Sequence, residues 1–237
     1  MRRSIHTLVL LLALGLVPAA ARADDKSDSA AFYKAGMAYK AQGKTDEAIE
    51  QLEKAVKSDP NHGEAWASLG HLYKQKDDIK KSIDAYEHAT QTITKDKSIW
   101  RNLAVAYENT GKLDQAKTAL TTANKLDPKD GEVLYLLGTV KGKLKDNKGA
   151  IADLEAAVKV KQDEPEWFHN LGLAYRRENR IDDSIKMYEK AIATEEPASY
   201  SRYQTEIEPF LKPFDSLYLG SSISGDLAKS TIYITVQ

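Results

Sequence analysis

The sequence predicts an all-α protein built from five consecutive helix pairs, and two observations support this. One pattern recurs every 34 residues without insertion, and it is clearest at Trp66, Leu69, Gly70 and Tyr73. Their spacing of i, i+3, i+4 and i+7 places them on one face of an α-helix. A second stripe of small and large residues follows within each repeat. We therefore divide the chain into five blocks, residues 29–62, 63–96, 97–130, 131–164 and 165–198.

The first helix of each block carries an aromatic or aliphatic residue, a small residue and usually a tyrosine on one face. The corresponding residues are Phe32, Ala35, Gly36 and Tyr39, then Trp100, Leu103, Ala104 and Tyr107, then Leu134, Leu137 and Gly138, then Phe168, Leu171, Gly172 and Tyr175. A turn is expected next, at Gly43, Asp77, Gly111, Lys145 and Asn179. Four of these five residues favour turns, whereas Lys145 does not.

The second helix of each block carries a small residue, a large residue and an alanine at spacing i, i+4 and i+7. The small residues are Ala48, Ser82, Ala116, Ala150 and Ser184, the large ones are Leu52, Tyr86, Leu120, Leu154 and Tyr188, and the alanines are Ala55, Ala89, Ala123, Ala157 and Ala191. Small residues opposite large ones predict closely packed helices. Pro60 and Pro128 end two of the blocks, where a helix must stop.

This period and pattern resemble the tetratricopeptide repeat over residues 29–198. The resemblance implies a right-handed superhelical solenoid of antiparallel helix pairs, with a concave groove lined by the first helices and a C-terminal capping helix. The chain departs from the family pattern at Lys141, which replaces the first-helix tyrosine of the fourth block. Thr94, Gln162 and Glu196 replace the closing proline.

The N-terminal residues predict a cleaved secretory signal. Arg2 and Arg3 precede a short apolar run from Leu8 to Val17, and small residues follow up to Ala23, after which we expect the cut. The run is too short to cross a bilayer comfortably, so we expect no stable membrane span after cleavage. Residues 24–28 are expected to form a short flexible segment. These features suit a periplasmic or secreted bacterial protein.

The segment 199–237 is expected to hold the capping helix and an irregular or β-prone tail. Pro209 and Pro213 limit the helix, and Leu217–Leu219 and Thr231–Val236 are rich in β-favouring residues. The tail either folds back on the repeats or stays mobile. Alternatively, it pairs as a strand with the sheet edge of a partner.

The sequence contains no recognisable catalytic, cofactor or metal motif. Cysteine is absent, and the 34 basic residues are balanced by 35 acidic ones, unlike the basic footprint of a nucleic-acid binder. His62, His71, His88 and His169 do not form a pair with metal-ligand spacing. We therefore expect no enzymatic activity, no cofactor, no metal and no nucleic-acid partner.

The resemblance implies that a ligand lies along fixed positions of the first helices. Carried over position by position, the candidate binding residues are Tyr33, Met37, Lys40, His71, Lys74, Arg101, Val105, Tyr135, Lys143, His169, Leu173, Arg176 and Arg177. Several are cations at first-helix ends. Such cations either complement the helix dipoles or grip an acidic segment of a ligand.

These features predict a non-enzymatic adaptor that holds a protein or peptide segment in its groove, within an envelope or secretion assembly. The cations favour acidic residues in that ligand. Two alternatives remain open. One is a self-associating scaffold, and the other is a module that recognises cell-wall glycans for an enzyme complex.

Overall fold

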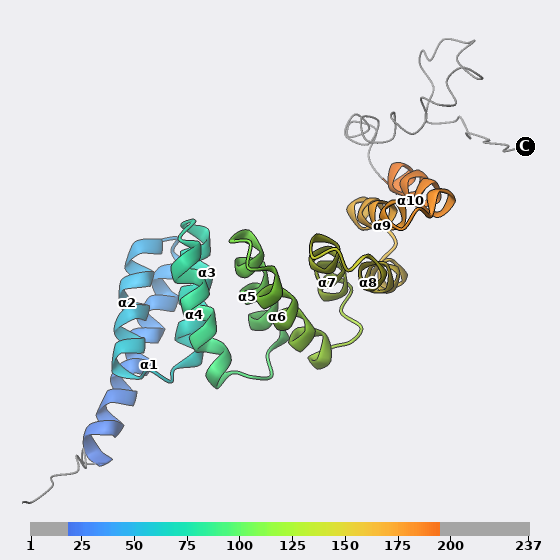
Figure 1. Cartoon of the computed structure of the whole chain (residues 1–237). Coiled ribbons are helices and arrows are strands. Elements are labelled where there is room, and N and C mark those ends of the chain that lie inside the picture. The colour runs from blue at the N-terminus through green and yellow to red at the C-terminus, as the bar shows by residue number, and fades with distance from the viewer. Residues whose placement is uncertain (1–18, 195–237) are drawn as a thin grey trace, which may run out of the picture. The chain divides into compact units, whose positions relative to one another are not determined.

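The computed structural model describes residues 19–194 and contains ten helices in that range, with no strand among the described residues. All ten helices are labelled in Figure 1. The predicted all-α class is confirmed, and each block contains two helices. Their bounds are α1 (Ala19–Ala41), α2 (Thr45–Ser58), α3 (Gly63–Gln75), α4 (Ile79–Thr92), α5 (Lys97–Asn109), α6 (Leu113–Leu126), α7 (Gly131–Lys143), α8 (Asn147–Val160), α9 (Pro165–Arg177) and α10 (Ile181–Thr194).

The chain folds as two compact units, Met1–Ala106 and Tyr107–Gln237, and the boundary falls within α5. In the first unit, α1 packs on α2, α2 on α3, and α3 on α4. In the second unit, α6 packs on α7, α7 on α8, α8 on α9, and α9 on α10. Within each unit, a helix therefore contacts the helices that precede and follow it in sequence.

Helix α1 begins earlier than the repeat pattern predicts. It starts at Ala19, so the residues 24–28, expected to be flexible, are helical. No glycine or proline interrupts the chain between Ala19 and Ala35, and alanine, lysine and arginine are good helix formers. Within the part of the chain that is described, no helix combines the length and apolarity needed to cross a membrane. Most of the predicted signal and the whole 199–237 segment lie outside the described residues.

The second-helix stripe is buried in the core, as predicted. The alanines Ala55, Ala89 and Ala123 are fully buried, and the large residues of this stripe are at most 5% exposed. The facing glycine leaves room for the large side chain. A Cβ atom on Gly70 would lie 2.8 Å from the Tyr86 ring, and one on Gly138 would lie 2.7 Å from Cγ of Leu154. The glycine is needed for this close helix approach.

Serine replaces alanine wherever the large second-helix residue is a tyrosine. The Ser82 hydroxyl donates a hydrogen bond to the Gly70 carbonyl at 2.7 Å, and the Ser184 hydroxyl donates to the Gly172 carbonyl at 2.8 Å. Both serines are buried. Each hydroxyl is thus satisfied inside the core, where an unpaired one would be costly.

All five expected turn residues adopt the left-handed conformation. Their φ angles are 73° at Gly43, 60° at Asp77, 74° at Gly111, 64° at Lys145 and 59° at Asn179. The next residue donates its backbone N–H to a carbonyl five residues earlier, as from Lys44 to Tyr39 at 3.0 Å and from Asp146 to Lys141 at 2.9 Å. This is the Schellman pattern that ends many helices. Lys145 therefore forms the same turn as the glycines.

A tyrosine–glutamate hydrogen bond joins successive blocks. The Tyr73 hydroxyl on α3 donates to Glu53 on α2 at 2.5 Å, and the Tyr175 hydroxyl on α9 donates to Glu155 on α8 at 2.6 Å. Burial, together with the bond to Glu155, raises the pKa of Tyr175 to about 12. These phenols therefore stay protonated and donating at neutral pH.

The junction between the third and fourth blocks lacks the residues for this tyrosine–glutamate contact. Lys141 takes the place of the tyrosine, and Thr121 stands where Glu53 and Glu155 stand in their own blocks. The Lys141 ammonium pairs instead with Asp153 of its own block at 2.6 Å. Burial raises the pKa of Asp153, although its interaction with Lys141 opposes this shift. The substitution thus exchanges a contact between blocks for one within a block.

Trp66 and Trp100 occupy equivalent environments, as the 34-residue period requires. The indole N–H of Trp66 donates to the Pro60 carbonyl at 2.8 Å, and that of Trp100 donates to the Thr94 carbonyl at 2.9 Å. Both acceptors lie six residues before the tryptophan. The indoles therefore fasten the start of a first helix to the loop that precedes it.

Replacing Lys145 with glycine should stabilise the protein. A left-handed conformation costs a residue with a Cβ roughly 1–2 kcal/mol, and the greater flexibility of glycine offsets part of this gain. We expect the free energy of unfolding in urea to rise by about 0.5–1 kcal/mol. The converse change, Gly111→Lys, should lower it by a similar amount, because nothing lies within 4 Å of a Cβ placed there. Equal stability of Lys145→Gly and the unmodified protein would contradict this account of the turn.

Replacing Ala123 with leucine should destabilise the protein. Ala123 is fully buried in α6, so the larger side chain must displace its neighbours, at a cost of about 1–3 kcal/mol. Urea denaturation followed by circular dichroism measures this change. Ala152→Leu provides the control, because Ala152 is exposed on α8 and should tolerate the same change.

Candidate functional site

In the first unit, the predicted binding residues lie half-buried on the first helices. These residues are Tyr33, Met37 and Lys40 on α1, His71 and Lys74 on α3, and Arg101 and Val105 on α5. Met37 connects two of these helices, because its sulfur accepts a hydrogen bond from the Ser68 hydroxyl at 3.6 Å. The Tyr33 ring lies 4.9 Å from the His62 ring. Apolar and cationic groups thus share the surface of these helices.

Three basic residues form what we call the cationic cluster, namely Lys40 on α1 and His71 and Lys74 on α3. Burial lowers the pKa of His71, and the charges of Lys40 and Lys74 lower it further. Among the described residues, no carboxylate pairs with any of the three. The cluster therefore carries positive charge that the described part of the protein does not neutralise, and His71 is mostly neutral at pH 7.

The charge of Arg101 influences the second helix of the preceding pair. Burial raises the pKa of the Tyr86 hydroxyl to about 12, whereas the side chain of Asn102 and the charge of Arg101 act in the opposite direction.

In the second unit, two of the predicted cations are held by neighbouring groups. The Lys143 ammonium lies 2.7 Å from the Glu108 carboxylate. The Arg177 guanidinium donates to the Gly142 carbonyl at 3.1 Å, near the C-terminal end of α7. For Arg177, this geometry agrees with a cation that complements a helix dipole. Leu173 and Arg176 are half-buried on α9.

His169 does not lie on an open surface, contrary to the sequence-based prediction. Its side chain is buried at 8% exposure, and its ring centroid lies 5.5 Å from that of Tyr188 on α10. Packing against α10 holds it inside the helix pair. We therefore leave His169 out of the candidate binding surface.

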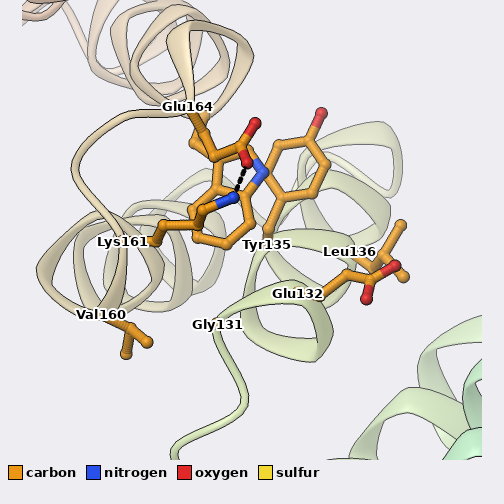
Figure 2. Close-up of a pocket in the computed structure, with 8 residues that line it drawn as sticks. Gly131, Glu132, Tyr135, Leu136, Val160, Lys161 and Glu164 are labelled. Carbon is orange, nitrogen blue, oxygen red and sulfur yellow. Dashed lines mark hydrogen bonds and ion pairs between the residues drawn. The ribbon is translucent and has the colours of Figure 1, made fainter.

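Tyr135 contributes to a hollow where α7, α9 and the end of α8 meet, which we call the α7–α9 hollow. Its volume is about 440 Å³. Figure 2 shows the residues that line it: Gly131, Glu132, Tyr135, Leu136, Val160, Lys161, Glu164 and Trp167. Of the predicted binding residues, Tyr135 alone belongs to this lining.

A stacked aromatic pair forms one side of the α7–α9 hollow. The rings of Tyr135 and Trp167 are nearly parallel at 12°, with centroids 5.3 Å apart. The Tyr135 hydroxyl accepts a hydrogen bond from Asn170 at 2.7 Å. Burial raises the pKa of Tyr135, and the negative charge of Glu166 raises it further. The phenol is thus fixed in place and stays protonated.

An ion pair between Lys161 and Glu164 also lines the α7–α9 hollow and is drawn as a dashed line in Figure 2. Its hydrogen bond to Glu164 raises the pKa of Lys161. Glu164 is the N-cap residue of α9, yet its side chain makes no capping hydrogen bond. The neighbouring Val160 is 53% exposed.

The sequence pattern does not reveal this hollow, although Trp167 gives one signal. Trp167 stands at the block position that holds Ala65, Ile99 and Val133 in other blocks, so it is an unusually large residue there. No group of three or more histidine, aspartate or glutamate residues that could hold a metal ion occurs among the described residues.

Comparisons with known proteins support the repeat assignment. A family model of the cilia and flagella-associated protein 70 C-terminal domain, a tetratricopeptide-repeat domain, matches residues 4–205. No curated protein sequence matches the chain.

Several solved structures share the fold at low sequence identity. A crystal structure of MamA is 24% identical, covers 67% of this chain and 93% of its own, and has a TM-score of 0.64. YrrB, described as a tetratricopeptide-repeat protein with an unusual peptide-binding site, is 17% identical and has a TM-score of 0.72. Its match covers 80% of this chain and 96% of the YrrB chain. PilF of Pseudomonas aeruginosa is 19% identical and has a TM-score of 0.60. Its match covers 84% of this chain and 95% of the PilF chain.

These structural likenesses agree with the ten helices, the buried alanine stripe and the five equivalent turns. The match to the family model extends over most of the chain. The chain therefore belongs to the tetratricopeptide-repeat family represented by the C-terminal domain of cilia and flagella-associated protein 70.

Proposed function

We propose that the protein is a non-enzymatic scaffold that binds an acidic segment of a partner protein on its first helices. The observation that carries this proposal is the cationic cluster of Lys40, His71 and Lys74. Like charges held close together repel one another, and their repulsion is reduced when an anion binds between them. A partner carboxylate is such an anion, and it forms charge-assisted hydrogen bonds with lysine.

The surroundings of the cluster suit a peptide segment better than a free ion. Tyr33 and Met37 lie half-buried on α1, the helix that carries Lys40. These residues offer apolar contacts beside the positive charge. Protein interfaces commonly combine such apolar anchors with a polar or charged rim. The peptide-binding site named for YrrB is consistent with this use of the fold.

The proposal also includes a location. We propose that the scaffold acts in the bacterial periplasm, within an envelope or secretion assembly. The support is the N-terminal pattern of Arg2 and Arg3, the apolar run Leu8 to Val17 and the small residues before Ala23.

A photoreactive amino acid at Met37 should crosslink to a partner in native cells, whereas one at Lys57 should not. Met37 is half-buried on α1, and Lys57 is exposed on α2. Mass spectrometry identifies the crosslinked protein. The purified partner should then bind the double variant Lys40→Ala and Lys74→Ala roughly five- to thirtyfold more weakly, because charge-assisted contacts are lost.

The control for this experiment removes the same charge elsewhere. Lys57→Ala combined with Lys80→Ala changes two exposed lysines on α2 and α4 and should leave the affinity within about twofold, as rim charges contribute little. An equal loss of affinity in both double variants would show that the effect comes from net charge alone, and it would contradict the proposal. A Met37 adduct that contains only two copies of this chain would favour the self-associating alternative.

The affinity for the acidic partner should increase as the pH falls below 6.5. His71 is neutral at pH 7 because its pKa is lowered, so acidification adds a third positive charge that faces the ligand. In the free protein, the same protonation is unfavourable beside Lys40 and Lys74. The stability that neutral His71 gives the folded protein should therefore be lost as the pH falls from 6.5 through the lowered pKa of His71.

Titration calorimetry with the purified partner at pH 7.5 and pH 5.5 measures this effect. His71→Gln should remove the part of the pH dependence that comes from this residue. If the variant and the unmodified protein show the same change in affinity between the two pH values, His71 does not contact the bound segment.

A further inference from the structure

We infer that the α7–α9 hollow binds an arginine side chain of a partner segment, which displaces Lys161 from Glu164. The inference rests on the proposed function in one respect, because it takes the arginine to belong to the bound partner. It concerns the second unit only and can be tested without the cationic cluster. It adds a basic residue to the chemistry expected of the partner.

The lining of the hollow matches the two parts of an arginine side chain. Val160 and Leu136 provide aliphatic surface for the methylene stem. Glu164 provides a carboxylate, which guanidinium groups bind bidentately. The Tyr135 ring is only half-buried, and aromatic faces attract guanidinium groups. An acidic side chain would be repelled by Glu164, and a purely aliphatic one could not compete with Lys161 for it.

The hollow is also large enough to take a single long side chain. Its volume of about 440 Å³ lies toward the lower end of the roughly 300–1,000 Å³ typical of small-ligand sites. A folded partner surface cannot enter such a space, whereas one projecting side chain can.

Lys161 already places a cation on Glu164 in the α7–α9 hollow. The two residues are three positions apart, and their side chains are 49% and 35% exposed. Exposed pairs of this kind contribute little to stability, so a competing cation can replace Lys161 at small cost. Since the Glu164 side chain makes no capping bond to α9, its exchange of cations leaves the helix end unchanged.

Another block junction of the chain fills the corresponding space with an aliphatic residue. At Gly63, a Cβ atom would lie 2.7 Å from Cγ1 of Ile93, which occupies the block position of Lys161. Ile93 follows the end of α4 and packs against the start of α3. In the fourth block, Lys161 stands in place of Ile93 and forms an ion pair with Glu164. This replacement distinguishes the α7–α9 hollow from the junction at Gly63.

The test uses the full chain and the blocked tripeptide acetyl-Gly-Arg-Gly-amide. Titration is followed by the indole N–H signal of Trp167 in two-dimensional NMR, assigned with the variant Trp167→Phe. We expect a saturable shift of this signal. The tripeptide with glutamine in place of arginine has similar size but no charge, and it should cause no saturable shift. Equal shifts with both peptides, or none with arginine, would overturn the inference.

Two variants give opposite expected effects. Glu164→Gln should weaken arginine-tripeptide binding, whereas Lys161→Gln should strengthen it roughly two- to fivefold, because the internal competitor is removed. Lys148→Gln changes an exposed lysine near the start of α8, the helix that ends just before Lys161, and should leave the affinity unchanged. Unchanged or weaker binding in Lys161→Gln would refute displacement, and this surface change does not endanger the fold.

The outcome separates this inference from the proposed function. If the tripeptide fails to bind while the natural partner still depends on Lys40 and Lys74, only the arginine site is refuted. If the tripeptide binds as expected but the double lysine variant binds the partner normally, the acidic-segment proposal is refuted and the arginine site stands.

Discussion

The close approach of two helices within each pair is the constraint on which the rest of this structure depends. In four of the five pairs a glycine on the first helix faces a large residue on the second, as Gly70 faces Tyr86, and a Cβ atom there would lie too close to the ring. The fully buried alanines of the second helix, such as Ala89, allow equally close packing. Because interiors are packed as densely as crystals, this fit fixes the relative position of the two helices. The first-helix side chains of the proposed binding surface are thereby held in place.

Much of the fold can be predicted from the sequence because its constraints are local and repeated. The apolar stripes predict ten helices, and Gly43 and Gly111 mark two turns by residue type alone. Lys145 could not be assigned with the same certainty, since its positive φ angle is imposed by the hydrogen bonds that close the turn. The early start of α1 at Ala19 was missed because the repeat pattern does not extend that far.

The candidate site is less predictable, because its contacts join residues in different blocks. The sequence identifies Lys143 as a cation at a helix end, but its pairing with Glu108 depends on how adjacent blocks align. His169 has the expected spacing for an inner surface and yet packs against Tyr188. The α7–α9 hollow combines Gly131, Val160 and Trp167 from three helices, so no local pattern contains it.

The five turns are closed by hydrogen bonds between main-chain groups. Glycine, aspartate, lysine and asparagine all occupy the same left-handed position, so the closure tolerates different side chains. Duplicated copies of such a unit could accumulate substitutions on their outer residues while each hairpin kept its geometry. Evolution can therefore alter the recognition chemistry of one copy without redesigning the architecture that presents it.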